Sequence, residues 1–297
     1  MTPPAFITMG TNGLWVGKFE TGYKGATTTA SAQVNSSDSA KVQIKPNVYS
    51  WRSIQIANSF LASYNYQRDL DSHMMKNTEW GAVAYLQHSK YGSATNVRIN
   101  NNAAYITGYA AKVEGESKSE STSLGIDGTN TYNYKNSSSV VASTTGNYTG
   151  IYDMSGGNYE AMMGVMLDSA SSAPLSGRNS TYHSNFNGTL YEGGSITGGT
   201  NFPNTRYFDR YAHSKLYTNF NQRILGDAIG ESGPFTISVT QQFGSWYKNE
   251  AFYISSEGTW VYRGGTWSRG LYTSIFSFYH AGGQANNQFG FRIVLAI

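Results

Sequence analysis

The sequence predicts a mixed α+β fold with two main helices, short antiparallel strands and much irregular loop. Charged residues make up only 13% of the 297 residues, against about 25% in ordinary soluble domains, which disfavours a bundle of helices with charged outer faces. Two segments keep the apolar spacing of a helix, and the C-terminal third contains several short β-favouring runs. No composition shift or repeat divides the chain, so we predict one domain over residues 1–297.

The first half of the chain contains both predicted helices. A strand is expected at Leu14–Glu20. The first helix is expected to begin at Trp51, with Ser50 as its N-cap, because apolar residues follow at helical spacing as far as Tyr64. The second helix is expected over Thr78–Lys90, with Thr78 as its cap.

Irregular segments separate the remaining predicted strands. Residues 109–147 and 171–203 are rich in Gly, Ser, Thr and Asn without a sustained period, which indicates two loop insertions. Between them, residues 151–157 resemble a short strand that runs into a turn. The later strands are expected at Phe235–Val239, Phe252–Ile254, Trp260–Tyr262, Ser274–Phe278 and Phe289–Leu295.

Charge and residue usage exclude several classes of function. The formal charge is +3 and no run of five Lys or Arg occurs, so no nucleic-acid partner is expected. No stretch approaches the ~18 apolar residues of a membrane span, and no membrane insertion is expected. The chain has no cysteine, and its five histidines show no i, i+4 pair. No cofactor is therefore expected, a structural metal such as calcium is left open, and a hydrolase site assembled from distant loops has no positive support.

Six segments stand out, in this order along the chain: Gly13–Glu20, Ser50–Arg52, Met75–Tyr85, Gly150–Glu160, Arg263–Trp267 and Gly290–Arg292. Together they resemble the sulfatase-modifying-factor, or formylglycine-generating-enzyme-like, family, which implies a C-type-lectin-like fold over nearly the whole chain. Enzymatic members use a pair of cysteine thiols, and this chain has none, so the resemblance implies the fold without the chemistry.

One member of these segments makes a specific structural prediction. Arg292 lies in a nearly apolar strand, so its guanidinium is expected to stack or to pair with backbone carbonyls or a carboxylate. The candidate carboxylates are Glu79, Asp153 and Glu160.

The segment 263–292 also resembles the variable region of proteins diversified by retroelements. Such proteins, in phage receptor-binding proteins and on bacterial surfaces, hold changeable residues on a C-type-lectin-like scaffold. The scaffold positions here are Arg263, Gly264, Gly265, Trp267, Gly270, Ile275, Phe276, Phe278, Gly290, Phe291 and Arg292, with Ile275 and Ser277 expected on one strand face and Phe276 and Phe278 on the other. The candidate ligand-binding residues are Thr266, Ser268, Arg269, Leu271, Tyr272, Thr273, Ser277, Tyr279, His280, Ala281, Gln284, Ala285 and Gln288.

The sequence therefore favours a non-catalytic receptor-binding or adhesion protein. Its partner would be a protein or glycan ligand on a cell surface, with Tyr272, Tyr279 or Trp260 available to stack on a sugar. The resemblance implies a phage tail or a bacterial surface as its location, and assembly into a homo-oligomer is left open. The alternatives are an enzyme, or degenerate enzyme, of the formylglycine-generating class, and a structural phage or pilus subunit.

Overall fold

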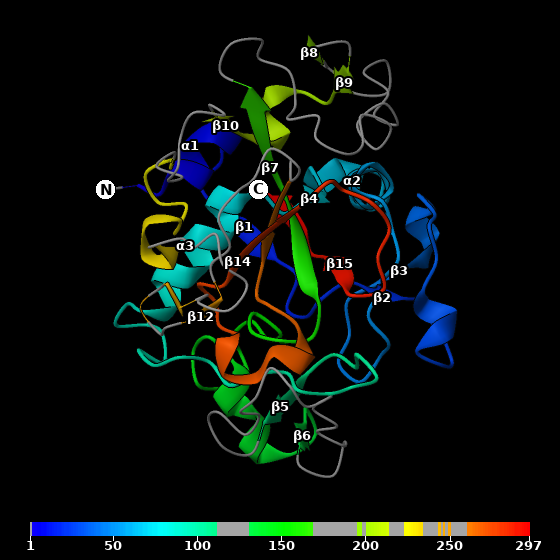
Figure 1. The fold of residues 1–297 in the computed structure, drawn as a ribbon, viewed down its shortest axis with the longest axis vertical. Coiled ribbons are helices and arrows are strands. Elements are labelled where there is room, and N and C mark those ends of the chain that lie inside the picture. Colours follow the sequence, from blue (N-terminus) through cyan, green and yellow to red (C-terminus); the bar gives the residue numbers. More distant parts are fainter. Residues whose placement is uncertain are drawn as a thin grey trace.

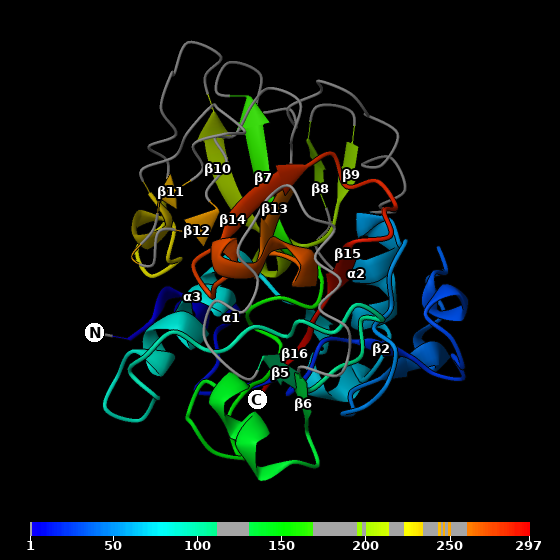
Figure 2. The same ribbon diagram turned by 60° about the horizontal axis from the view of Figure 1, so that its bottom comes forward.

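A computed structural model describes residues 2–111, 131–168, 195–197, 200–213, 223–233, 243–244, 246, 249–250 and 260–297. These residues form a mixed α+β fold, as predicted, in which three segments are α-helices (Figures 1 and 2). The helices are α1 (Pro4–Met9), α2 (Ile56–Tyr64) and α3 (Asn77–Gln87).

The largest sheet is built around β7 (Tyr159–Asp168), the longest described strand. β13 (Trp260–Arg263) runs antiparallel along one side of β7 and pairs in turn with β14 (Phe278–Ala281). β15 (Phe289–Phe291) and β10 (Asp209–His213) both pair with β7 in parallel, β15 with its first residues and β10 with its last. The expectation of short antiparallel strands is therefore only partly correct.

A three-stranded sheet joins distant parts of the chain. β16 (Ile293–Ala296) lies between β1 (Leu14–Val16) and β4 (His73–Met74), antiparallel to both. The remaining described strands form two-stranded pairs: β2 (Gly22–Tyr23) with β3 (Val42–Gln43), β5 (Tyr109–Ala111) with β6 (Thr131–Asn133), β8 (Ser195–Thr197) with β9 (Thr200–Phe202), and β11 (Phe243–Gly244) with β12 (Asn249–Glu250).

Both faces of β7 are buried, because a helix covers each face of the sheet. Alternate side chains, such as Met163 and Val165, pack with Phe60 of α2, whereas Met162 and Met166 pack on the other face, in the cluster that includes residues of α3. Figure 1 shows α2 and α3 on opposite sides of β7. A strand buried on both faces has a nearly continuous apolar sequence. β7 therefore lacks the alternation of apolar and polar residues from which a half-buried strand is predicted.

The predicted start of the first helix is wrong. The helix begins at Ile56, five residues after Trp51, with Gln55 at the N-cap. Trp51 and Arg52 are extended, and their backbone N–H groups donate to Thr21 O (2.8 Å) and Ala32 O (3.0 Å). The Ser50 hydroxyl donates to the Glu20 carboxylate, so it does not cap the helix.

The second helix is confirmed with shifted ends. It begins at Asn77 and ends at Gln87. The Thr78 hydroxyl donates to Asp209, so it does not cap the helix. Instead the Glu79 carboxylate accepts a hydrogen bond from the Lys76 backbone N–H (2.8 Å), which satisfies a donor at the helix start.

Several predicted strands and loops are also corrected. The strand predicted at Leu14–Glu20 ends at Val16, and residues 151–157 form no strand, because Asp153 has φ 61° and Gly156 and Gly157 also have positive φ. Residues 109–147 include β5, β6 and a 3-10 helix at Ser137–Ala142. The end of the second insertion, 171–203, includes β8 and β9. Residues 112–130, 171–194 and 198–199 of the insertions, and the predicted strands Phe235–Val239 and Phe252–Ile254, lie outside the described residues.

Candidate functional site

The C-terminal segment 263–292 connects three strands of the large sheet. After β13 the chain turns at Gly264 and Gly265, both with positive φ, and enters a 3-10 helix at Trp267–Tyr272. A Cβ on Gly265 would lie 2.2 Å from the Thr273 methyl carbon, so this position requires glycine. The two glycines therefore belong to the scaffold, as the sequence predicts.

The strand predicted at Ser274–Phe278 is a turn, and the strand β14 begins only at Phe278. The Ser277 backbone N–H donates to Ser274 O (3.0 Å), and the Ser277 hydroxyl accepts from the Ser274 N–H (2.9 Å). Ile275, Phe276 and Phe278 are all fully buried, so the expected alternation between two strand faces is wrong here.

Four predicted ligand-binding residues are buried and are removed from the candidate surface. The Thr266 hydroxyl donates to Gly157 O (3.1 Å), the Thr273 hydroxyl donates to Gly270 O, and the Ser277 hydroxyl donates to Tyr272 O (3.1 Å). Ala281 packs in the hydrophobic cluster that includes Phe60 of α2. These short polar side chains satisfy the backbone of the turns, which is why small polar residues recur there.

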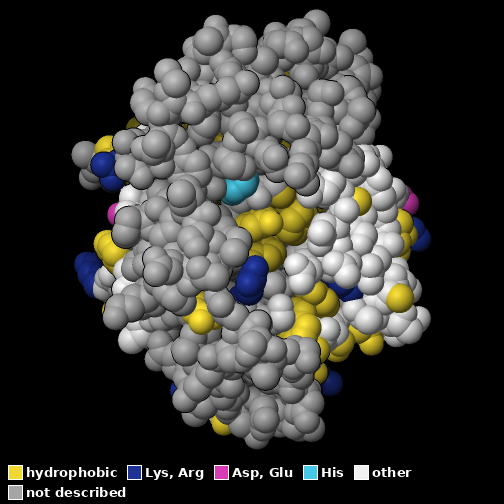
Figure 3. Space-filling model, viewed as in Figure 1, with side chains coloured by type: hydrophobic (Ala, Val, Ile, Leu, Met, Phe, Trp, Pro, Cys, Tyr) yellow, Lys and Arg dark blue, Asp and Glu magenta, His cyan; other side chains and the backbone are white. Residues whose placement is uncertain are grey.

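The other predicted residues are half-buried or exposed, and we call them the C-terminal surface. The side chain of Leu271 lies outside the described ones. Figure 3 shows a hydrophobic patch in the middle of one face of the molecule, with a histidine and a Lys or Arg side chain at its border. The C-terminal surface consists of Ser268, Arg269, Tyr272, Tyr279, His280, Gln284, Ala285 and Gln288.

Within this surface, stacked rings connect β7 to the edge strand β14. The rings of Tyr159 and Tyr279 stack with centroids 4.9 Å apart, and the Tyr279 ring lies parallel to that of His280 at 5.7 Å. Arg269 Nε donates to the Tyr159 hydroxyl at 3.3 Å. Because Tyr279 and His280 are only half-buried, they present flat faces held in fixed orientation.

Buried aromatic side chains, Tyr262 and Phe289, pack against the Tyr279 ring. Tyr262 lies opposite Tyr279 in the pairing of β13 with β14, and its ring centroid is 4.4 Å from that of Phe289. Burial, followed by the charge of Tyr279, raises the pKa of Tyr262, so its hydroxyl stays neutral. Sequence reasoning assigned none of Tyr159, Tyr262 and Phe289 to the site. Their only signal was an aromatic residue in each strand, and the strand pairing was not known.

In the structure Arg292 pairs with Glu160, one of the three candidate carboxylates. Arg292 Nε and Nη2 donate to the two Glu160 oxygens at 2.8 and 2.5 Å, and both side chains are fully buried. Arg292 also donates to Gly17 O and Tyr152 O, so all of its nitrogens have acceptors. Arg292 therefore holds three chain segments together, which is a scaffold role.

Two further carboxylates share the Arg292 region. Burial, and then the charges of Asp153 and Glu160, raise the pKa of Glu20 well above its usual value. Burial also raises the pKa of Asp153, against the charge of Arg292. With three buried acids and one guanidinium, protonation of the acids relieves their repulsion.

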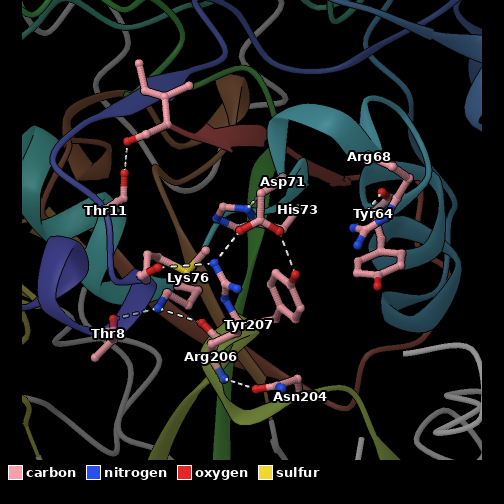
Figure 4. Close-up of polar contacts among 12 residues, drawn as sticks. Thr8, Thr11, Tyr64, Arg68, Asp71, His73, Lys76, Asn204, Arg206 and Tyr207 are labelled. Atoms are coloured by element: carbon pink, nitrogen blue, oxygen red, sulfur yellow. Dashed lines mark hydrogen bonds and ion pairs between the residues drawn. The ribbon is translucent and has the colours of Figure 1, made fainter. Parts of the chain in front are cut away.

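A second polar network lies at the start of α3 (Figure 4). His73 Nδ1 bonds to Asp71 O at 2.7 Å, which requires Nδ1 to carry the proton, and Nε2 lies 2.8 Å from Glu79 Oε1. Lys76 Nζ donates to Thr8 Oγ1 (2.7 Å) and Arg206 O (2.9 Å). His73, Lys76 and Glu79 are fully buried, so this network joins α1, α3 and the chain before β10.

Neither network has the composition of a metal site. Among the described residues, no group of three or more His, Asp or Glu side chains could hold a metal ion. In the same part of the chain, no helix is long and apolar enough to cross a membrane.

Comparison with known proteins adds no family assignment. No protein-family model matches the chain, and no curated protein matches it.

Proposed function

We propose that this chain is a non-catalytic ligand-binding protein that uses the C-terminal surface for recognition. The observation that carries the proposal is the row of stacked rings formed by Tyr159, Tyr279 and His280, with Arg269 hydrogen-bonded to the Tyr159 hydroxyl. Rigid aromatic rings with polar tips provide contact area at a low cost in conformational entropy, and this is how adaptable recognition surfaces use tyrosine.

The segment combines fixed and changeable positions, which supports a diversified surface on a C-type-lectin-like scaffold. Gly265, Phe278 and Arg292 cannot change without loss of packing or pairing. By contrast, Ser268 and Ala285 are open to solvent at least in part. Side chains of this second kind can be exchanged with little effect on folding, as diversification requires.

The size of the surface favours a small ligand. Its eight residues fall short of the ~20–30 residues per side of a standard protein interface. A glycan that stacks on Tyr279 fits this area, whereas a protein ligand needs additional contacts from the insertions 109–147 and 171–203. We place such a protein on a phage tail or a bacterial surface, by its resemblance to diversified receptor-binding proteins.

The absence of catalysis is part of the proposal and follows from the residues available. The chain has no cysteine, so it lacks the thiol pair of the enzymes it resembles. The histidine–glutamate pair of His73 and Glu79 is fully buried, which leaves no room for a substrate. A cysteine-containing sulfatase peptide incubated with the protein and copper should therefore yield no aldehyde.

The test replaces three surface residues and measures binding to a glycan array and to a panel of intact bacterial cells. Tyr279 is left unchanged, because it packs against the core. The variant Arg269→Ala/Tyr272→Ala/His280→Ala should lose the binding of the wild type, with a Tm within a few degrees. The matched control Arg68→Ala/Tyr91→Ala, on exposed residues elsewhere, should keep it.

Two results would contradict the proposal. One is full binding by the triple variant, and the other is loss of folding, which would make these residues part of the core. The claim of diversification has its own test in the coding DNA. A near-copy of the segment for residues 268–288, differing mainly at template adenines and lying beside a reverse transcriptase, is expected.

A further inference from the structure

We infer that Arg52, Asn101, Tyr105 and Trp267 form a binding site for the carboxylate of an acidic sugar, at the border of the C-terminal surface. This inference rests on the proposed function and names the chemical class of its ligand. It starts from buried polar atoms that have no hydrogen-bond partner in the part of the chain that the structure describes.

Arg52 is a buried guanidinium without a carboxylate. Its side chain is 1% exposed, and it lies over the Tyr105 ring with the guanidinium carbon 3.9 Å from the ring centroid. Nη1 donates to Asn287 O (2.6 Å), and Nη2 donates to Thr29 O (2.7 Å) and to the Thr29 hydroxyl. Nε has no hydrogen-bond partner. All of its hydrogen bonds therefore go to neutral groups, and the carboxyl whose charge reaches it, Glu20, is shared with the buried Asp153, Glu160 and Arg292.

The two other fully buried arginines, Arg263 and Arg292, have a hydrogen-bond acceptor for each of their side-chain nitrogens. Arg292 has the Glu160 carboxylate. Arg263 also lacks an ion pair, but its Nε, Nη1 and Nη2 donate to Asn77, Ser232 and Asp227 at 2.7–2.8 Å. Burial without a carboxylate is thus compatible with a structural role, and the unpartnered Nε is what distinguishes Arg52.

More unpartnered polar atoms lie on segments that meet at Arg52. Trp267 Nε1 is buried without an acceptor, and its ring meets the edge of Tyr105 at 6.1 Å. Asn101, four residues before Tyr105, is 1% exposed and has neither a donor for Oδ1 nor an acceptor for Nδ2. Asn158 Oδ1 is also without a donor. Buried polar groups without a partner are uncommon in folded proteins, and this part of the chain has several of them.

Backbone contacts bring these segments together. Gly157 O accepts from Trp267 N (3.1 Å), and Gly157 N donates to Asn100 O (2.8 Å). In Figure 2 the chain that leads to β5 runs beside the orange 3-10 helix that begins at Trp267. Asn287, whose carbonyl binds Arg52, is exposed and adjoins Gln288 of the C-terminal surface. The site thus has a rim in solvent and continues the surface proposed above.

The unpartnered atoms indicate the chemistry of the occupant. Arg52 Nε, Trp267 Nε1 and Asn101 Nδ2 are donors, which a carboxylate accepts. The amide oxygens of Asn101 and Asn158 are acceptors, which sugar hydroxyls satisfy. Buried water can also bond to such atoms, but water supplies no negative charge to the Arg52 guanidinium, which has no carboxylate within hydrogen-bonding distance. A sugar acid supplies both the negative charge and the hydroxyl donors, whereas an acidic peptide side chain supplies only the first.

The experiment titrates the protein with sodium glucuronate by isothermal titration calorimetry. Glucose serves as the ligand control without a carboxylate, and N-acetyl-aspartate amide serves as the carboxylate without a sugar. Trp267→Phe removes the Nε1 donor and keeps an aromatic ring. Trp246→Phe is the matched control, because Trp246 is 59% exposed and contacts His88 and Phe276 instead. Circular dichroism melts verify that both variants fold.

We expect saturable binding of glucuronate, at least tenfold weaker for Trp267→Phe and unchanged for Trp246→Phe. Glucose and N-acetyl-aspartate amide should bind at least tenfold more weakly than glucuronate. No saturable heat with glucuronate, equal binding of either control ligand, or equal weakening by both variants would overturn the inference. The Arg269→Ala/Tyr272→Ala/His280→Ala protein should still bind glucuronate, so failure here and failure of the C-terminal surface are separate results.

Discussion

The regions around Arg292 and Arg52 both bury a guanidinium, but they differ in what surrounds it. Arg292 lies between β15 and β16, pairs with Glu160 through two hydrogen bonds, and has an acceptor for every nitrogen. Arg52 lies before α2, has no carboxylate partner, and leaves Nε without an acceptor. The difference separates a guanidinium that is paired with a carboxylate from one whose hydrogen bonds all go to neutral groups.

The same difference applies to the two kinds of small polar residue in the C-terminal segment. Thr266 and Ser277 bond to backbone carbonyls and are buried, whereas Ser268 lies partly in solvent. Residue type alone does not distinguish scaffold from surface. Scaffold residues are distinguished by the hydrogen bonds that their side chains make inside the protein. Substitution of one residue of each kind tests this distinction.

The largest expected effect is on the Arg292 side. Arg292→Met leaves the Glu160 and Asp153 carboxylates buried without their cation, so the free energy of unfolding should fall by about 3–5 kcal/mol. Arg52→Met removes a charge that has no carboxylate and should cost only about 1–2 kcal/mol. Urea denaturation at pH 7 measures both values. Lys24→Met, at an exposed site, is the control with little effect, and equal losses at the two buried arginines would break the comparison.

The next largest effect concerns the buried carboxyl of Asp209, whose nearby cation and hydrogen bonds do not fully offset the cost of burying its charge. Burial raises the pKa of Asp209 to about 6, against the opposing charge of Lys76 and hydrogen bonds from Thr78. The folded protein therefore holds a proton that the unfolded chain releases between pH ~4 and ~6. Stability from this group is present at the low end of the window and is lost as the pH rises through it, by on the order of 3 kcal/mol.

Asp209→Asn should flatten this part of the pH dependence. Urea denaturation at several pH values between 4 and 7 measures the slope for wild type and variant. Glu79 has the opposite pH dependence. Burial alone would raise the pKa of Glu79, but the charge and the hydrogen bond of His73 hold it below its usual value. The stability that Glu79 contributes is therefore lost only as the pH falls below that usual value. An unchanged slope in Asp209→Asn would show that Asp209 is ionised throughout the window.

The smallest effect distinguishes the two serines. Ser277→Ala removes a hydroxyl that donates to Tyr272 O and accepts from Ser274 N, so unfolding should become easier by about 1–2 kcal/mol. Ser268→Ala should change stability by less than about 0.5 kcal/mol. Thermal melts of the pair suffice. A larger loss at Ser268 would place it with the scaffold and reduce the C-terminal surface by one residue.

The sequence predicted an element correctly where residues close together in the chain determine its structure. The apolar spacing within Thr78–Lys90 led to α3, although with shifted ends, and the β-favouring run at Trp260–Tyr262 led to β13. The rule that buried charges are paired was enough to include Glu160 among three candidate partners of Arg292, but the choice among the three needed the structure. The mixed α+β class followed from composition and these elements.

Long-range pairing was beyond such reasoning. Trp51 has helical spacing with Ile54, yet its backbone hydrogen bonds to Thr21, thirty residues earlier in the sequence, hold it extended. The packing of Tyr262 against Tyr279 depends on the register of β13 with β14. The unpartnered Nε of Arg52 depends on which carbonyls reach that side chain. Each is decided by segments distant in sequence.

The position of β16 has a consequence for the order of folding. β1 and β4 have no direct pairing in their sheet, since β16 lies between them and supplies hydrogen bonds to both. During synthesis β1 and β4 emerge more than two hundred residues before β16. Contacts of such high sequence separation slow folding. The edges of β1 and β4 that β16 covers therefore stay unpaired until the last residues of this sequence are synthesised.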